Sequence, residues 1–213
     1  DVSDMTEQQQ PFVSRAGLKL DHALREFNID VNGFTCADFG CNIGGFTDCL
    51  LQRGAARVFS IDTGYGTLAW KLRNDPRVVV MERTNALHVP PPADQKMVAV
   101  PILMDLVVID LAWTPQRLAI PAALKWLKPE GRIITLVKPH YELADDEKQA
   151  LLKDGFLDPA HAEPILTRVL GQLPSWGATP LAHTQSPLTG GKSSRGREGH
   201  GNVEFLVLAK AND

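Results

Sequence analysis

Cysteine is scarce in this chain, whose 213 residues include only Cys36, Cys41 and Cys49. Their spacing forms neither a C-x-x-C pair nor the even-numbered framework of a disulfide-stabilised secreted domain. The sequence therefore excludes a disulfide scaffold and offers no cysteine-based metal site. We expect reduced thiols, no bound metal and a cytoplasmic protein.

Long apolar runs are also missing. The longest, residues 97–104, is short and contains Pro101, whereas a membrane-spanning helix needs about 20 mostly apolar residues. No charged and then apolar secretory leader opens the sequence. We therefore expect no membrane partner.

The chain has no excess of positive charge, since 22 lysines and arginines stand against 25 acidic residues and the net charge is −3. A nucleic-acid surface would have to be a local patch rather than the whole molecule. Apolar residues make up 44% of the chain, which is ordinary for one globular domain. We expect a flexible polar tail over residues 1–12 and a single domain over residues 13–213.

What the sequence does contain is a regular alternation of strands and helices. The strands are continuous apolar runs rather than alternating ones, which favours a parallel sheet with helices on both faces. Ligands of such sheets bind beyond the carboxyl ends of the strands. Predicted strands cover residues 34–39, 57–62, 78–81, 105–110, 132–137, 179–185 and 203–208. Predicted helices cover residues 15–27, 45–53, 68–73, 118–126, 145–152 and 160–173.

A glycine-rich stretch, D-F-G-C-N-I-G-G-F-T-D at residues 38–48, follows the first predicted strand. It differs from a phosphate-binding P-loop because Phe46 stands where the lysine belongs. It also fails the dinucleotide fingerprint, because Asn42 replaces a glycine. Asp38 would repel a polyphosphate. The stretch therefore indicates a ligand that resembles a nucleoside and carries little negative charge.

Two acidic residues indicate what that ligand contains. Asp62 ends the second predicted strand, and a carboxylate there can accept hydrogen bonds from two ribose hydroxyls. The alternative for Asp62, a cap for the next helix, is equally open. Asp38 could pair with a cationic amino group, while a turn used only for packing is the alternative for the glycines. A ribose, an amino acid and no phosphate describe S-adenosylmethionine better than NAD or ATP.

Several motifs together resemble one family. They are V-S-R-A-G-L-K-L, D-F-G-C-N-I-G-G-F-T-D-C-L-L-Q-R-G-A, I-D-T-G-Y-G-T-L-A-W-K-L-R, M-E-R-T-N, D-L-V-V-I-D and L-V-K-P-H-Y-E. Over residues 12–210 the chain is similar to the FtsJ-like ribose 2′-O-methyltransferases, and within them to the TlyA (hemolysin A-type) ribosomal RNA methyltransferases. The resemblance implies a Rossmann-like class I methyltransferase of the α/β class. Its sheet would be mostly parallel and seven-stranded, with a reversed last strand and helices on both faces.

The same resemblance implies a Lys-Asp-Lys-Glu catalytic set, which falls on Lys19, Asp110, Lys138 and Glu204. A ribose hydroxyl is a weak nucleophile until a base removes its proton, and Lys138 would be that base. A lysine can accept a proton only if its pKa is lowered, which burial and a neighbouring cation such as Lys19 achieve. Taken singly, a surface lysine, a strand-end lysine and an edge-strand glutamate are the simpler interpretations.

The predicted contacts to S-adenosylmethionine extend along the carboxyl ends of several strands. Tyr65 or Leu87 is expected against the adenine. The predicted cofactor-binding residues are Asp38, Gly40, Asn42, Gly44, Gly45, Phe46, Asp62, Asn85 and Asp110.

RNA, either ribosomal RNA or a ribosomal subunit, is the expected partner. Trp113 could stack on a base, although a core tryptophan is an equally good interpretation. The glycine-rich segment 189–202 could clamp RNA phosphates or be an ordinary insertion. TlyA-type proteins usually carry an N-terminal RNA-binding module, which we do not find in this sequence. The predicted RNA-binding residues are Arg15, Trp113, Lys192, Arg195 and Arg197.

Two other functions compete with an RNA 2′-O-methyltransferase. One is a non-catalytic RNA- or ribosome-binding protein on the same fold. The other is a membrane-lytic hemolysin, which the family name suggests. The lack of an apolar span or a long cationic amphipathic helix counts against that interpretation.

Overall fold

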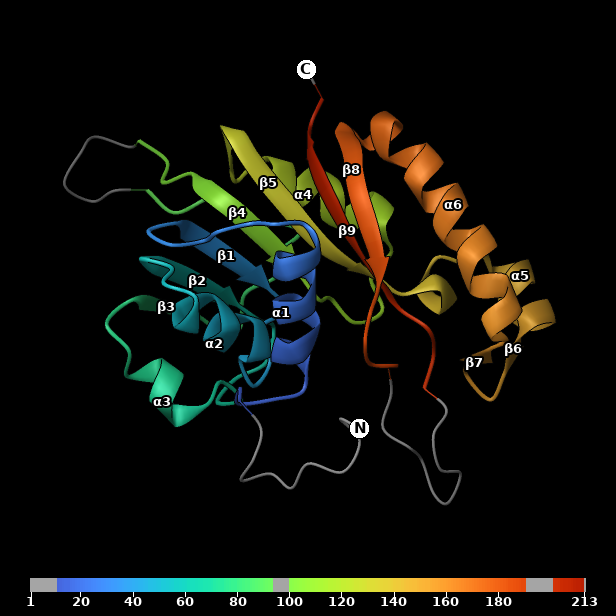
Figure 1. The fold of residues 1–213 in the computed structure, drawn as a ribbon, viewed down its shortest axis with the longest axis horizontal. Coiled ribbons are helices and arrows are strands. Elements are labelled where there is room, and N and C mark those ends of the chain that lie inside the picture. Colours follow the sequence, from blue (N-terminus) through green and yellow to red (C-terminus); the bar gives the residue numbers. More distant parts are fainter. Residues whose placement is uncertain (1–10, 94–99, 191–200, 213) are drawn as a thin grey trace.

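The computed structural model describes residues 11–93, 100–190 and 201–212. A seven-stranded sheet with the order β3-β2-β1-β4-β5-β9-β8 forms its centre (Figure 1). The strands are β1 (Thr35–Phe39), β2 (Arg57–Ile61), β3 (Val78–Met81), β4 (Met104–Ile109), β5 (Leu127–Val137), β8 (Ala178–Gln185) and β9 (Phe205–Ala211). The α-helices are α1 (Ala16–Glu26), α2 (Gly45–Gln52), α3 (Trp70–Arg73), α4 (Gln116–Leu124), α5 (Asp145–Leu151) and α6 (Ala162–Gln172).

The sheet is mostly parallel. Strands β1 to β5 pair in parallel, whereas β9 runs antiparallel to both of its neighbours, β5 and β8. This arrangement confirms the predicted fold class, including the reversed last strand. Because the five parallel strands end at the same edge, the residues that follow them are brought together there.

Successive residues of each strand point to opposite sides of the sheet, and helices pack on both of these faces. Cys36 of β1 packs in one buried cluster with residues of α1 and α2, while Ala37 packs in another with residues of α4 and α6. Figure 1 shows α1 and α2 in front of the sheet and α4 behind it. Two apolar layers therefore hold the parallel strands in place.

Three local features differ from the sequence prediction. Strand β5 begins at Leu127 rather than 132, because Leu127 pairs with Met104 beyond an irregularity in the register. A small hairpin of β6 (Leu152–Lys153) and β7 (Phe156–Leu157) was not predicted, since two-residue strands are too short for a recognisable pattern. Phe12, placed in the tail by the sequence prediction, is 8% exposed and belongs to the core. No helix in the described ranges has the length and apolar character needed to span a membrane.

The glycine turn before α2 permits a close approach between α1 and α2. A Cβ at Gly45 would lie 2.3 Å from Ser14 Oγ and 2.8 Å from the backbone nitrogen of Gly17. Gly44, at φ 103°, has the left-handed conformation that favours glycine. Its neighbours Leu68 and Leu72 leave no space for a side chain. Much of the glycine turn thus serves packing.

Gly45→Ala is expected to lower the free energy of unfolding by about 1–3 kcal/mol, the usual range for overpacking a filled site. Gly171→Ala is the matched control, because a Cβ there meets nothing within 4 Å and Gly171 lies within α6. Alanine is the better helix former by about 1 kcal/mol, so the control is expected to be stabilising. Urea denaturation of both variants checks this pair. Equal stability of Gly45→Ala and the wild type would contradict the packing role.

Candidate active site

Two ion pairs lie in one pocket at the carboxyl edge of the sheet. Lys138, which follows β5, has its Nζ 2.5 Å from Oδ1 of Asp110, which follows β4. Lys19 on α1 has its Nζ 2.5 Å from Oε2 of Glu204, which precedes β9. All four side chains line a pocket of about 510 Å³. The structure therefore brings together the four residues of the expected catalytic set; their chemical role remains a prediction.

The neighbours of Lys138 stabilise its charged form. Burial disfavours an ammonium and by itself lowers the pKa of Lys138. The Asp110 carboxylate, its hydrogen bond and the charge of Glu204 outweigh burial, so the pKa of Lys138 is raised above its usual value. The sequence argument predicted a lowered pKa for Lys138, because it considered burial and Lys19 but not a carboxylate at 2.5 Å. Lys138 is protonated in this state.

Glu204 lies between the ammonium group of Lys19 and the backbone of Gly190. Only 3% of its side chain is exposed. Burial raises the pKa of Glu204, while Lys19 and Lys138 act in the opposite direction. A Cβ at Gly190 would overlap Oε1 of Glu204, so only glycine fits there without a shift. The carboxylate is thus fixed where it can hold Lys19.

A second cavity of about 370 Å³ adjoins the pocket of the ion pairs. The two linings have Asp110 and Trp113 in common. This cavity lies at the carboxyl ends of β1 to β4, where parallel sheets bind ligands. Five of the predicted cofactor-binding residues line it, namely Gly40, Asn42, Asp62, Asn85 and Asp110. Of the two candidates for the adenine, Leu87 lines the cavity and Tyr65 does not.

Asp62 is oriented by two backbone donors. Its Oδ2 accepts a hydrogen bond from the Asn42 N–H at 2.8 Å, and its Oδ1 accepts one from the Gly64 N–H at 2.7 Å. Each carboxylate oxygen still has a lone pair for another donor. Gly40, at φ 89°, passes so close to the backbone of Asp110 that a Cβ would lie 2.6 Å from its carbonyl oxygen. The backbone of Gly40 and the carboxylate of Asp62 therefore both form part of the cavity wall.

Asp38 has a different environment from the one predicted. It is fully buried, and its Oδ2 accepts hydrogen bonds from Thr47 N at 2.9 Å and Thr47 Oγ1 at 2.7 Å. Its Oδ1 is buried without a hydrogen-bond partner in the described part of the chain. Burial above all, with the charges of Asp110 and Asp62, raises the pKa of Asp38 to about 7 despite the bonds from Thr47. Asp38 holds the turn rather than lining the cavity.

Three further predicted contacts lie behind the cavity wall. Gly44 and Gly45 pack against neighbouring helices and loops, and Phe46 is 2% exposed in the core. None of the three lines the cavity. Their sequence signal, a glycine turn, reflects the close packing of α1 and α2, which a one-dimensional pattern cannot separate from ligand contact.

An aromatic rim borders both cavities. Trp113 is 83% exposed and has a φ of 57°, so it is not the core tryptophan that the sequence left open. Its ring lies 5.1 Å from that of Tyr141. A bulky residue at positive φ is strained, and such strain is common at functional sites. Trp113 is thus held, exposed, at the junction of the two cavities.

Tyr141 and His140 line the pocket of the ion pairs and were missed in the sequence. Their rings lie 4.2 Å apart, and Lys138 Nζ lies 5.6 Å from the centre of the Tyr141 ring. Burial, followed by the charge of Lys138, lowers the pKa of His140 to about 4. Their position directly after Lys138 was the available signal.

Four basic residues are the other predicted RNA contacts. Arg15 is exposed at the N-terminus of α1, four positions before Lys19. Lys192, Arg195 and Arg197 lie outside the described residues. The predicted RNA clamp over 189–202 is therefore untested.

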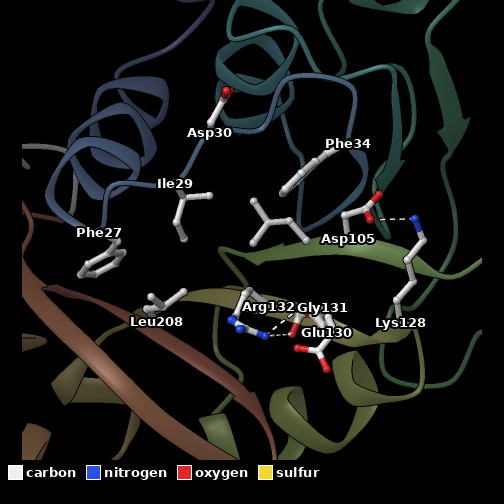
Figure 2. A pocket seen from close by; sticks show the side chains of 11 residues that line it. Phe27, Ile29, Asp30, Phe34, Asp105, Lys128, Glu130, Gly131, Arg132 and Leu208 are labelled. Atoms are coloured by element: carbon white, nitrogen blue, oxygen red, sulfur yellow. Dashed lines mark hydrogen bonds and ion pairs between the residues drawn. The ribbon is translucent and has the colours of Figure 1, made fainter.

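A third cavity, of about 500 Å³, lies at the opposite edge of the sheet (Figure 2). Its lining includes Phe34 and Asp105 at the starts of β1 and β4, and Lys128 and Arg132 of β5. Lys128 pairs with Asp105 at 2.7 Å. Arg132 donates to the carbonyl oxygens of Glu130 and Gly131. None of the predicted site residues lines this cavity.

The fold and the position of the cavities define a class of protein, the Rossmann-like methyltransferases. A solved structure from Listeria monocytogenes, provisionally described as an S-adenosylmethionine-dependent methyltransferase, superimposes with a TM-score of 0.60 at 18% identity. The match covers 94% of this chain and 100% of that one. The chain belongs to the FtsJ-like methyltransferase family, whose model matches residues 12–195.

Two more similar proteins narrow the comparison. The 16S/23S rRNA (cytidine-2′-O)-methyltransferase TlyA of Mycobacterium tuberculosis is 46% identical over 139 residues, which are 65% of this chain and 50% of that protein. The structure of a provisionally named hemolysin from Streptococcus thermophilus has a TM-score of 0.83 at 32% identity and covers 98% of this chain and 70% of that one. The chain spans 50–64% of the length of the first curated relatives that it matches.

Asp38→Asn is expected to change the pH dependence of stability. Since burial raises the pKa of Asp38 to about 7, the folded state binds a proton that the unfolded state releases near pH 4. This contribution is fully present below about pH 4 and is lost as the pH rises through about 7. The asparagine variant has no carboxylate to ionise at this position. The free energy of unfolding of the wild type, relative to that of the variant, is therefore expected to fall by a few kcal/mol across that window, at about 1.4 kcal/mol per pKa unit.

Denaturant unfolding of both proteins at pH 5 and pH 8 checks this expectation. Glu142, whose pKa burial also raises to about 7, is present in both and cancels in the difference. A difference in stability that is constant with pH would contradict the assignment to Asp38.

Proposed function

We propose that this protein transfers a methyl group from S-adenosylmethionine to the 2′-hydroxyl of a ribose in RNA, with ribosomal RNA as the substrate class. One observation carries the proposal. The pairs Lys138–Asp110 and Lys19–Glu204 lie in a pocket that has Asp110 and Trp113 in common with a cavity lined by acids and glycine. A cofactor and a ribose bound in these two places would meet at Asp110.

The residues of the 370 Å³ cavity fit S-adenosylmethionine. Asp62 and Asp110 place negative charge on the cavity wall, which suits a ligand with a positive sulfonium and a positive amino group rather than a polyphosphate. Asp62 would accept the ribose hydroxyls, and Gly40 allows the backbone a close approach. Behind this wall, Oδ1 of Asp38 is buried without a hydrogen-bond partner in the described part of the chain. When bound, the cofactor supplies an electrophilic methyl group.

Lys138 would act as the general base once it has lost its own proton. The carboxylates of Asp110 and Glu204 raise the pKa of Lys138, and a positive charge in the adjoining cavity would lower it again. The neutral amine would then accept the proton of the 2′-hydroxyl as that oxygen becomes the nucleophile. Asp110 holds Lys138, and Glu204 holds Lys19, so that the reacting groups are oriented before reaction. General-base catalysis of this kind typically contributes about 10²–10⁴-fold.

RNA would enter from the side of the aromatic rim. Trp113 presents an exposed ring where the two cavities meet, and aromatic rings stack on unpaired bases. Arg15, near Lys19, is proposed as a phosphate contact. Because the substrate class is ribosomal RNA, the expected cytoplasmic localisation belongs to this proposal too.

Asp62→Ala is expected to weaken binding of S-adenosylmethionine about 10- to 150-fold, which corresponds to the loss of a charge-assisted hydrogen bond of about 1.5–3 kcal/mol. Asp62→Asn is the control for the fold, because its amide oxygen still accepts a backbone N–H, and its effect is expected to be smaller. Isothermal titration calorimetry measures the affinity, and thermal melting verifies folding. Unchanged affinity in both variants would remove Asp62 from the cofactor site.

Lys138→Ala is expected to abolish transfer of tritiated methyl groups to ribosomal RNA, with the affinity for S-adenosylmethionine nearly unchanged. The wild-type rate is expected to rise with pH, because the carboxylates hold the pKa of Lys138 above its usual value and only the neutral amine is active. Lys138→Arg is the matched control, since an arginine keeps the charge but does not release its proton.

Rapid turnover by Lys138→Arg would overturn the role of Lys138 as base. Cofactor binding by the wild type without transfer to any RNA would instead favour the non-catalytic RNA-binding alternative.

A further inference from the structure

An exposed pair of side chains at the rim of the cofactor cavity has no part in the proposed chemistry. Tyr65 is 69% exposed, and the Arg83 guanidinium lies 4.2 Å from the centre of its ring. Tyr65 follows β2 and Arg83 follows β3. Thr63, Thr84 and Asn85, close to them in the chain, line the cavity. The pair therefore lies beside the cavity and faces solvent.

The backbone of Arg83 is strained to hold this geometry. Its φ is 51°, a left-handed conformation that is unfavourable for a residue other than glycine. Its N–H donates to the Gly64 carbonyl oxygen at 3.0 Å. Such strain persists where the surrounding structure enforces it, and it gathers at functional sites.

The charge of Arg83 is not compensated by any acid among the described residues. Its neighbour Arg73 pairs with Glu82, and Arg77 pairs with Asp75. Within the same part of the chain, Arg83 makes no ion pair and no side-chain hydrogen bond, and its side chain contacts the Tyr65 ring. The exposed guanidinium of Arg83 is therefore available to an external anion such as a phosphate.

Large apolar side chains are also exposed on the segments that precede and follow Tyr65 in the chain. Trp70, at the start of α3, is 77% exposed, and Ile43, in the glycine turn, is 44% exposed. The Ala69 N–H donates to the Ile43 carbonyl oxygen at 3.0 Å, which joins the two segments. Exposed aromatic rings beside a cation form the combination that binds single-stranded nucleic acid, since rings stack on bases and cations contact phosphates.

We propose that Tyr65 and Arg83 bind an unpaired nucleotide of the RNA substrate that lies outside the catalytic pocket, with its base on the ring and its phosphate on the guanidinium. This inference rests on the proposed function and adds a second RNA-binding position to it. Three strand spacings of about 4.8 Å each separate the end of β3 from the end of β4. The position therefore takes a nucleotide a few residues away from the methylated one.

The test uses equilibrium binding of a fluorescein-labelled single-stranded uridine 12-mer, measured by anisotropy without turnover. Tyr65→Leu is expected to weaken binding roughly 5- to 100-fold, the range found for removing one base-stacking aromatic residue. Tyr65→Phe retains the ring and is expected to bind nearly as well as the wild type. The affinity for S-adenosylmethionine is expected to stay unchanged in both, since Tyr65 does not line the cavity.

Arg83→Gly separates a binding role from a structural one. Glycine relieves the strain at φ 51°, which offsets its greater entropy in the unfolded chain, so the melting temperature is expected to stay unchanged. The slope of log K against log salt is expected to fall by about 0.7, the value for one phosphate contact on a single strand. Arg57→Ala is the matched control, because Arg57 lies over the Phe59 ring at 5.1 Å at the opposite edge of the sheet, and its slope is expected to stay unchanged.

Unchanged RNA affinity in Tyr65→Leu together with an unchanged slope in Arg83→Gly would overturn this inference. Weakened binding of S-adenosylmethionine by Tyr65→Leu, or no affinity of the wild type for the 12-mer, would overturn it too. A lack of methyl transfer by the wild type would instead contradict the proposed function. The two failures are distinguishable, because the anisotropy measurement needs no transfer.

Discussion

The close pairing of Lys138 with Asp110 is the interaction on which the proposed chemistry depends. Lys138 is largely buried, so its ammonium needs a carboxylate to remain charged, and Asp110 at 2.5 Å supplies it. The same burial that makes the pair necessary also makes Lys138 sensitive to any further positive charge. In the proposed mechanism, a cationic ligand in the adjoining cavity would lower the pKa of Lys138 so that it can act as a base.

The parallel sheet makes this pairing possible. Lys138 follows β5 and Asp110 follows β4, and adjacent parallel strands end side by side. Glu204 reaches the same pocket from the opposite chain direction, because β9 runs antiparallel to β5 and Glu204 precedes it. Lys19 completes the set from α1, whose approach depends on the glycines before α2. The reversed strand and the close helix packing are thus requirements of the site as well as of the fold.

Three of the five residues other than glycine that have positive φ in the described part of the chain lie at this edge. Asn42, Arg83 and Trp113 have positive φ values and follow β1, β3 and β4. Two of the three carry large exposed side chains that a stable, isolated domain has no reason to present. This pattern distinguishes the carboxyl edge from the cavity at the opposite edge, whose Lys128 is paired with Asp105 (Figure 2). The carboxyl edge is therefore the edge at which we propose that both the cofactor and the RNA bind.

The sequence by itself determined the order and type of the main strands and helices, because continuous apolar runs and helical spacing are local properties. It also identified Asp62 and the four residues of the proposed catalytic set, since they end or precede recognisable elements or match the family motifs. Only the tertiary structure decided which side chains reach the cavities. Asp38 turns inward to Thr47, Phe46 enters the core, and Tyr65 faces solvent, because side-chain direction depends on packing between segments distant in the chain. The sign of the pKa shift at Lys138 was decided in the same way, by a carboxylate that comes within 2.5 Å only after folding.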